Sequence, residues 1–231
     1  MSVRQTLLTW RRPATDLCLL TWASGVMDAL SYLRAGVFTA NMTGNTVILG
    51  VAMVGPGRSR VPFSILAICA FTFGALVAGI ILVRRPSRQW AADLSSGMAL
   101  QLPFAILFTV LWALSPAGGG FGILAMLTTT AACALGIQSV AVRRLKISGA
   151  VTTFITGTIT TAIVSLLERK EPGAIPGKEE RSSPVFLASM LFLYILAALA
   201  GGCLALVHSR WAGLAATMPI AAVFIRSLKK Q

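Results

Sequence analysis

A small set of polar residues lies within otherwise apolar stretches of this chain, and these are the residues that could carry chemistry. Two polar runs, each containing a Thr-Gly pair, precede nine-residue apolar runs in the blocks 34–54 and 148–167. A Thr or Asn before such a run is a typical N-cap, because its side-chain oxygen accepts from free backbone N–H groups. Glycine permits the tight, non-helical backbone that leads into a helix. The residues are Asn41, Thr43, Gly44 and Asn45 in the first run, and Thr156, Gly157 and Thr158 in the second.

Each polar run predicts a half-helix that begins inside the apolar layer. The first N–H groups of such a half-helix and the positive end of its dipole would suit an anion or a polar oxygen. A second interpretation needs no ligand, because Thr and Asn side chains also satisfy the backbone of a helix break or bond between helices. The sequence leaves both interpretations open.

Asp28 is the one acidic residue well inside an apolar block. Ionisable groups in such positions are costly and frequently functional. Asp28 would bind a cation, carry a coupled proton, or pair with Arg34 about a turn and a half further on. Gln138, its approximate counterpart in the second half of the chain, cannot titrate. We predict that Asp28 and Gln138 flank a solute site formed by the two polar runs.

Catalysis by this chain is not expected. The single histidine, His208, lies at the end of an apolar block, and the four cysteines occur singly, without CxxC spacing. Nucleophilic and metal-dependent chemistry needs a general base or a cluster of ligands. A nucleotide-binding P-loop pattern is also absent from the sequence. We therefore predict no enzymatic activity, no metal site and no cofactor.

The composition indicates the class of protein. Of the 231 residues, 56% are hydrophobic and 12% are charged, whereas a soluble domain carries about twice that charge. The apolar residues occur in blocks of roughly 17–25, enough to cross a bilayer core of about 30 Å. The net charge of +13 comes largely from Lys and Arg in short connectors, where such residues set topology. We predict an all-α polytopic protein embedded in lipid, with no nucleic-acid partner.

Eight apolar blocks divide into two similar halves within a single membrane domain, 1–231. Blocks four and eight share Gly, Ala, Pro, Ala and Phe in register, as the pair Pro103/Pro219 illustrates. The Thr-Gly runs recur in blocks two and six. We predict two four-block repeats, 15–114 and 121–226, with a polar loop at 168–183. The blocks are 15–33, 34–54, 62–83, 94–114, 121–142, 148–167, 184–207 and 211–226.

The basic residues predict how these blocks cross the membrane. If all eight blocks crossed, Lys and Arg would divide about evenly between the two sides, against the positive-inside bias. If blocks 34–54 and 148–167 are re-entrant, 16 of the 20 basic residues fall on the side of both termini, which is then cytoplasmic. We therefore prefer six full transmembrane helices plus two re-entrant elements, with three spans per half related by inversion. A broken helix that still crosses is the main alternative for both blocks.

Two stretches carry a family resemblance. The sequences GVMDALSYLRAGVFTANMTGNTVILGVAM (25–53) and ALGIQSVAVRRLKISGAVTTFITGTITTAIVSLLE (134–168) resemble two signatures of the YoaK family of small bacterial inner-membrane proteins. That family is catalogued as a domain of unknown function. The resemblance implies a helical fold and a multi-pass location in the bacterial inner membrane. It implies no substrate and no mechanism.

The leading functional hypothesis is a secondary transporter or permease-like protein for a small polar or anionic solute. In that hypothesis one half of the chain rocks against the other to give alternating access. The alternative is a non-transporting membrane partner or assembly protein in which the Thr-Gly breaks are structural. The sequence names neither a substrate nor a coupling ion, and it is also compatible with a homo-oligomer.

Overall fold

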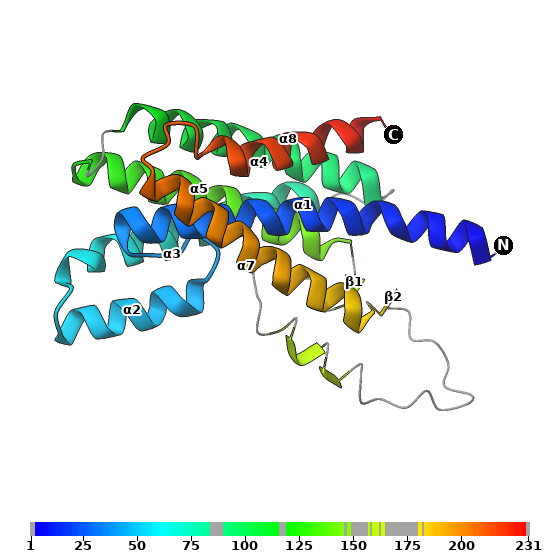
Figure 1. Ribbon diagram of the computed structural model, residues 1–231, viewed down its shortest axis with the longest axis horizontal. Coiled ribbons are helices and arrows are strands. Elements are labelled where there is room, and N and C mark those ends of the chain that lie inside the picture. The colour runs from blue at the N-terminus through cyan, green and yellow to red at the C-terminus, as the bar shows by residue number, and fades with distance from the viewer. Residues whose placement is uncertain are drawn as a thin grey trace.

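The computed structural model describes residues 3–83, 90–115, 119–145, 147–148, 157, 159–161, 163–164, 180–181 and 183–229. Long helices form a bundle (Figure 1): α1 (Val3–Ala35), α2 (Met42–Val54), α3 (Val61–Ala78), α4 (Trp90–Leu114), α5 (Phe121–Arg143), α7 (Pro184–Leu206) and α8 (Leu214–Leu228). A 3-10 turn, η1 (Arg58–Arg60), precedes α3, and a π-helical turn, η2 (Gly79–Val83), follows it. Two short strands, β1 (Ile147–Ser148) and β2 (Glu180–Arg181), pair in parallel.

The long helices run alternately in opposite directions. Helices α1, α4 and α7 run away from the end of the bundle that holds both termini, and α3, α5 and α8 run back toward it (Figure 1). The contacts agree with these directions. The rings of Phe63 and Phe121, at the starts of α3 and α5, lie 5.2 Å apart. Trp112, near the end of α4, donates to the Ser209 carbonyl before α8 at 3.0 Å. We call the end with both termini the terminal end, and the other the distal end.

Four helical segments have the length and apolarity of membrane spans, which confirms the all-α polytopic class. They expose many large apolar side chains, such as Phe73 and Phe192, and such a surface suits lipid. Helix α1 has 33 residues and carries two acidic side chains, Asp16 and Asp28, both buried. Within the described ranges, four segments qualify as spans by length and composition: Arg58–Leu82, Ala91–Leu114, Phe121–Arg143 and Pro184–Leu206.

The segment 36–54 enters and leaves the bundle at the distal end. Thr39 and Ala40 reach Asp28, which lies seven residues before the end of α1. The loop therefore descends roughly 10 Å beside that helix. Helix α2 then returns to the distal end, where Arg60 Nε would lie 2.8 Å from a Cβ on Gly36. Consequently α3 begins at the end where α1 stops (Figure 1). With 13 residues, or about 20 Å, α2 is shorter than a bilayer core.

Glycines allow the closest contacts between helices. Gly74 of α3 lies directly against the backbone of Cys133 on α5. Gly25 of α1 lies so close to α7 that a Cβ would be 2.7 Å from the Tyr194 carbonyl oxygen. Small residues at such positions let backbones approach and maximise van der Waals packing in a membrane bundle. The packing of α1 on α7 positions the polar residues described next.

Candidate functional site

Asp28 anchors the loop between α1 and α2. Its Oδ1 accepts hydrogen bonds from the Thr39 N–H at 2.6 Å, the Thr39 hydroxyl at 3.0 Å and the Ala40 N–H at 2.7 Å. Its Oδ2 accepts from the Tyr194 hydroxyl of α7 at 2.5 Å. The residue is only 3% exposed, so these four donors replace the water that a carboxylate requires. One buried acid therefore ties the loop to α1 and α7.

Asn45 holds the same loop from the side of α2. Its Oδ1 accepts from the Phe38 N–H at 2.8 Å, and its Nδ2 donates to the Phe38 carbonyl at 2.6 Å. One amide thus satisfies both backbone groups of a residue that lies outside regular structure. The Phe38 ring also stacks on Tyr32 of α1, with centroids 4.9 Å apart. The loop is consequently fixed against both helices that it connects.

The start of α2 differs from the sequence prediction. The helix begins at Met42, and its N-cap is Asn41, whose Oδ1 accepts from the Gly44 N–H at 3.0 Å. Thr43 lies in the first turn and is exposed, so of the Thr and Asn residues in this run it is Asn41 that caps the helix. Gly44 is helical, and the prediction of a non-helical backbone there is wrong. Its missing side chain makes room for the cap, because a Cβ would lie 3.0 Å from Asn41 Nδ2 and 3.1 Å from the Phe38 ring.

Gln138 joins α5 to α1 and α4. Its Nε2 donates to the Leu20 carbonyl at 3.2 Å and to Ser24 Oγ at 2.9 Å, and its Oε1 accepts from Gln101 Nε2 at 2.8 Å. The side chains of Ser24, Gln101 and Gln138 are fully buried. Ser24 precedes Asp28 by one turn of α1. The structure therefore brings Gln138 to the part of α1 that carries Asp28.

Sequence reasoning missed Ser24, Gln101 and Tyr194. For Gln101 a signal existed, because the alignment of blocks four and eight places it opposite Thr217, another polar residue in an apolar run. Thr217 also faces α4, where its hydroxyl lies 2.7 Å from Thr109 Oγ1. For Ser24 and Tyr194 the partners are distant in sequence, so local spacing carried no signal.

The second polar run is described only in part. Thr156 and Thr158 lie outside the described residues, as does most of the loop 168–183. Gly157 is helical and exposed, and a Cβ there would meet open space. Its carbonyl accepts from the Thr161 hydroxyl at 2.8 Å. The structure gathers the first-half residues and Gln138 around α1, and it does not pack Gly157 among them.

Arg34 contacts α4 instead of Asp28. Its guanidinium lies 4.3 Å from the centroid of the Trp112 ring and donates to Ser115 Oγ at 3.0 Å. Of the three roles considered for Asp28, the ion pair with Arg34 is therefore wrong. The physical reason is that the loop backbone and Tyr194 already supply the donors that the carboxylate needs.

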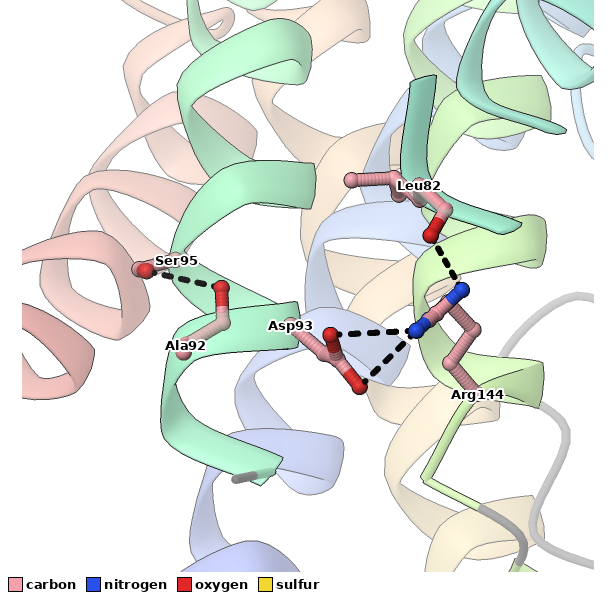
Figure 2. Close-up of polar contacts among 5 residues, drawn as sticks. All are labelled: Leu82, Ala92, Asp93, Ser95 and Arg144. Atoms are coloured by element: carbon pink, nitrogen blue, oxygen red, sulfur yellow. Dashed lines mark hydrogen bonds and ion pairs between the residues drawn. The ribbon is translucent and has the colours of Figure 1, made fainter. Parts of the chain in front are cut away.

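Arg144 joins three elements at the terminal end (Figure 2). Its guanidinium, just beyond α5, pairs with Asp93 of α4 at 3.3 Å and donates to the Leu82 carbonyl in η2. The two paired side chains are 12% and 11% exposed. The last carbonyls of a helical segment have no intrahelical donor, so Arg144 supplies one to η2. Beside this cluster, the Ser95 hydroxyl donates to the Ala92 carbonyl at 3.1 Å.

Comparison with known proteins assigns the family. The sequence pattern of the family described as "Protein of unknown function (DUF1275)" matches residues 17–226. The chain belongs to this family. It is 32% identical over 155 residues to the UPF0700 transmembrane protein YoaK of Bacillus subtilis (strain 168). That match covers 67% of this chain and 65% of the relative, so the chain spans just under two thirds of the relative's length. No solved structure matches the chain significantly.

Membership of this family confirms the YoaK resemblance drawn from 25–53 and 134–168. Together with the apolar helices, it shows a multi-pass membrane protein embedded in lipid. The family description states no function, so any activity must be argued from the arrangement of this chain's own residues.

Proposed function

We propose that this chain is a secondary transporter, or permease-like protein, for a small polar or anionic solute. The observation that carries the proposal is the path of 36–54, which turns back inside the bundle. Non-helical backbone at membrane depth is tolerated only where protein or a water-filled cavity satisfies its polar groups. Asp28 and Asn45 do so here, through Thr39, Ala40 and Phe38. Broken helices of this kind are recurrent elements of the substrate sites of secondary transporters.

The helix directions support two inverted halves. Helices α1, α3 and α4 each run opposite to α5, α7 and α8, their counterparts in order (Figure 1). The tight helix contacts are also exchanged between the halves, because a glycine-bearing helix of each half packs on the first helix of the other half. Gly74 of α3 packs on α5, and Gly201 of α7 packs on α1, where a Cβ would be 3.1 Å from the Val26 carbonyl. An exchange of this kind is expected for repeats related by a twofold axis in the membrane plane. We propose six spans, with re-entrant elements in 34–54 and 148–167.

The charges favour an orientation with both termini in the cytoplasm of a bacterial inner membrane. Arg34 and Arg60 lie at the distal end, beside α4 and Gly36. Arg144 and Arg226 lie toward the terminal end, the latter with its Nε 2.8 Å from Asp16 Oδ1. Because the terminal side also receives most of the connectors rich in Lys and Arg, the positive-inside bias assigns it to the cytoplasm.

The two halves are joined at both ends by contacts that a rocking motion would change. At the terminal end, Arg144 of the second half holds Asp93 and the Leu82 carbonyl of the first. At the distal end, Trp112 of the first half donates to the Ser209 carbonyl of the second. Alternating access would release one contact while the other persists, and the solute would lie between them.

We place the solute where the Asp28 loop of the first half meets Gln138 of the second. In this assignment Asn41, Gly44 and Asn45 shape the loop, and Thr43 is the exposed polar residue at the start of α2. The chain is proposed to move the solute without converting it chemically, so no catalytic residue is assigned.

Flux into liposomes tests this function. The purified full chain would be reconstituted and its uptake of formate, acetate, phosphate, urea and acetamide measured against protein-free liposomes. We expect selective uptake of at least one solute, and its loss in Gln138→Leu. The control is Thr109→Val, which alters a buried polar contact on α4 beyond the proposed site.

The partner or assembly hypothesis is the alternative outcome. It is favoured by the hydrogen bonds that already occupy Asp28 and Asn45 within the protein. In that case liposomes that contain the wild-type protein would admit none of these solutes faster than protein-free liposomes. The Asn45→Leu variant would also melt far lower than wild type. These two results together would support the partner or assembly role against transport.

A further inference from the structure

The orientation of the buried Gln138 amide is fixed by a backbone carbonyl. The Leu20 carbonyl can only accept, so the Gln138 atom 3.2 Å away must be the nitrogen, Nε2. Gln138 Oε1 therefore faces α4 as an acceptor. Gln101, 2.8 Å away, must in turn present its own nitrogen. The orientation of both amides thus follows from one unambiguous hydrogen bond.

This chain of constraints leaves Gln101 Oε1 as a buried acceptor. The Gln101 side chain is fully buried, and none of the residues that the structure describes donates to its oxygen. Buried amide oxygens in proteins are nearly always bonded to protein or to an ordered molecule. The position consequently calls for a donor that the described part of the chain does not supply.

The place of Gln101 in the bundle suits a transported solute. It is the twelfth of the 25 residues of α4, so it lies near the middle of that helix. Its partner Gln138 comes from α5 in the second half, and Gln138 also bonds to Ser24 of α1 in the first half. Transporter sites lie near the bilayer midplane, where the repeats meet. Pro103, two residues on, removes one backbone hydrogen bond of α4 and gives this turn freedom to move.

The charges around Gln101 decide the class of solute. Its hydrogen-bond partner, Gln138, is neutral, and so is Ser24, to which Gln138 donates. Asp28, one turn along α1, is already bonded to Thr39, Ala40 and Tyr194. An anion would bring a charge into a buried place and face an oxygen that repels it. A neutral molecule with N–H or O–H donors would instead match the amide oxygen.

We infer that the solute is a small neutral hydrogen-bond donor, such as a primary amide, a urea or an alcohol, and that Gln101 Oε1 is its principal contact. The inference rests on the proposed transport function and narrows its solute. A second buried oxygen lies on the same side of α1, at Ser31 Oγ, seven residues beyond Ser24. It has no partner among the described residues and marks a polar route toward the distal end.

Melting temperatures of the purified full chain in detergent test the inference, with acetamide, acetone, acetate and urea as probes. The first three have nearly the same shape, but only acetamide combines N–H donors with neutrality. We expect acetamide and urea to raise the melting temperature by roughly 3–6 °C when tenfold above Kd. Acetone and acetate should leave it unchanged. Gln101→Met should abolish the shift, and Thr109→Val should retain it.

Several results would overturn the inference. These are an equal shift with acetone, a shift with acetate alone, an unchanged shift in Gln101→Met, or no shift with either donor. No shift together with a Gln101→Met variant as stable as wild type would mean that the oxygen holds a structural water only. The acetone comparison uses wild-type protein, so it decides the matter even if the variant does not fold.

Flux separates this inference from the transport proposal. If liposomes that contain the wild-type protein take up an anion but no neutral donor, the transport proposal is supported and the assignment of a neutral solute fails. If acetamide or urea binds through Gln101 but no solute crosses, the binding site stands and the transport proposal fails.

Discussion

The hydroxyl of Tyr194 lies 2.5 Å from Oδ2 of Asp28, and this contact joins residues 166 positions apart. Because the other oxygen of the carboxylate holds Thr39 and Ala40, helix α7 and the α1–α2 loop share a single buried charge. A movement of α7 relative to α1 would therefore be transmitted to the loop. This coupling links the two halves of the chain beside the first polar run.

Tyr194→Phe should destabilise the protein by about 1.5–3 kcal/mol, the range for a hydrogen bond to a charged group. The measurement is the free energy of unfolding in mixed detergent micelles. In an Asp28→Asn background the same change should cost much less, because its acceptor is then neutral. Equal costs in the two backgrounds would show that Tyr194 stabilises the protein by packing alone.

Asn45→Leu should lower stability by about 2–4 kcal/mol, because it removes two hydrogen bonds and leaves the Phe38 N–H and carbonyl without partners. Thr43→Val, two residues away but exposed, should change stability by no more than about 0.5 kcal/mol. Thermal unfolding of the two variants checks the difference. Similar losses in both would mean that the whole first turn of α2 is equally constrained.

The sequence predicted the helices well because lipid imposes long apolar runs, which are visible without any knowledge of contacts. It placed the start of α2 wrongly, since the apolar run begins at Thr46 whereas the helix begins at Met42, where the Asn41 cap allows it. It also missed Gln101 and Tyr194 as partners of Gln138 and Asp28. Those pairs lie 37 and 166 residues apart, and only the packing of helices brings them together.

Trp22→Phe should cost about 1–2 kcal/mol through the loss of one partly buried hydrogen bond. The Trp22 indole donates to the Ala215 carbonyl at 3.1 Å. In a regular helix that carbonyl would accept from the N–H of residue 219, but Pro219 has none. In Pro219→Ala the carbonyl regains a helical donor, so Trp22→Phe should cost less there. A double-mutant cycle of unfolding free energies measures this, and strict additivity would contradict it.

Arg144→Met should destabilise the protein by about 1–3 kcal/mol, because Asp93 and the Leu82 carbonyl each lose a donor in a place sheltered from water. Arg143→Met, on the preceding and exposed residue, removes the same charge and should have little effect. Arg144→Lys should fall between them, since one ammonium cannot reproduce the fork of a guanidinium. Chemical denaturation of the three variants gives the order. A loss as large in Arg143→Met would show that net charge, not the cluster, is responsible.

Gly136→Ala should be the most damaging small substitution, because its new Cβ would overlap the Phe71 carbonyl oxygen and force α5 away from α3. Overpacking of this kind typically costs about 1–3 kcal/mol, and rigid backbone on both sides favours the upper part of that range. Gly202→Ala on α7 is the matched control, since a Cβ there meets open space. Because alanine is the better helix former by about 1 kcal/mol, that variant should equal or exceed wild type in stability. Melting temperatures in one detergent compare the pair. If both variants melted alike, α3 and α5 would have to separate easily, and the close packing that transmits movement between the halves would not exist.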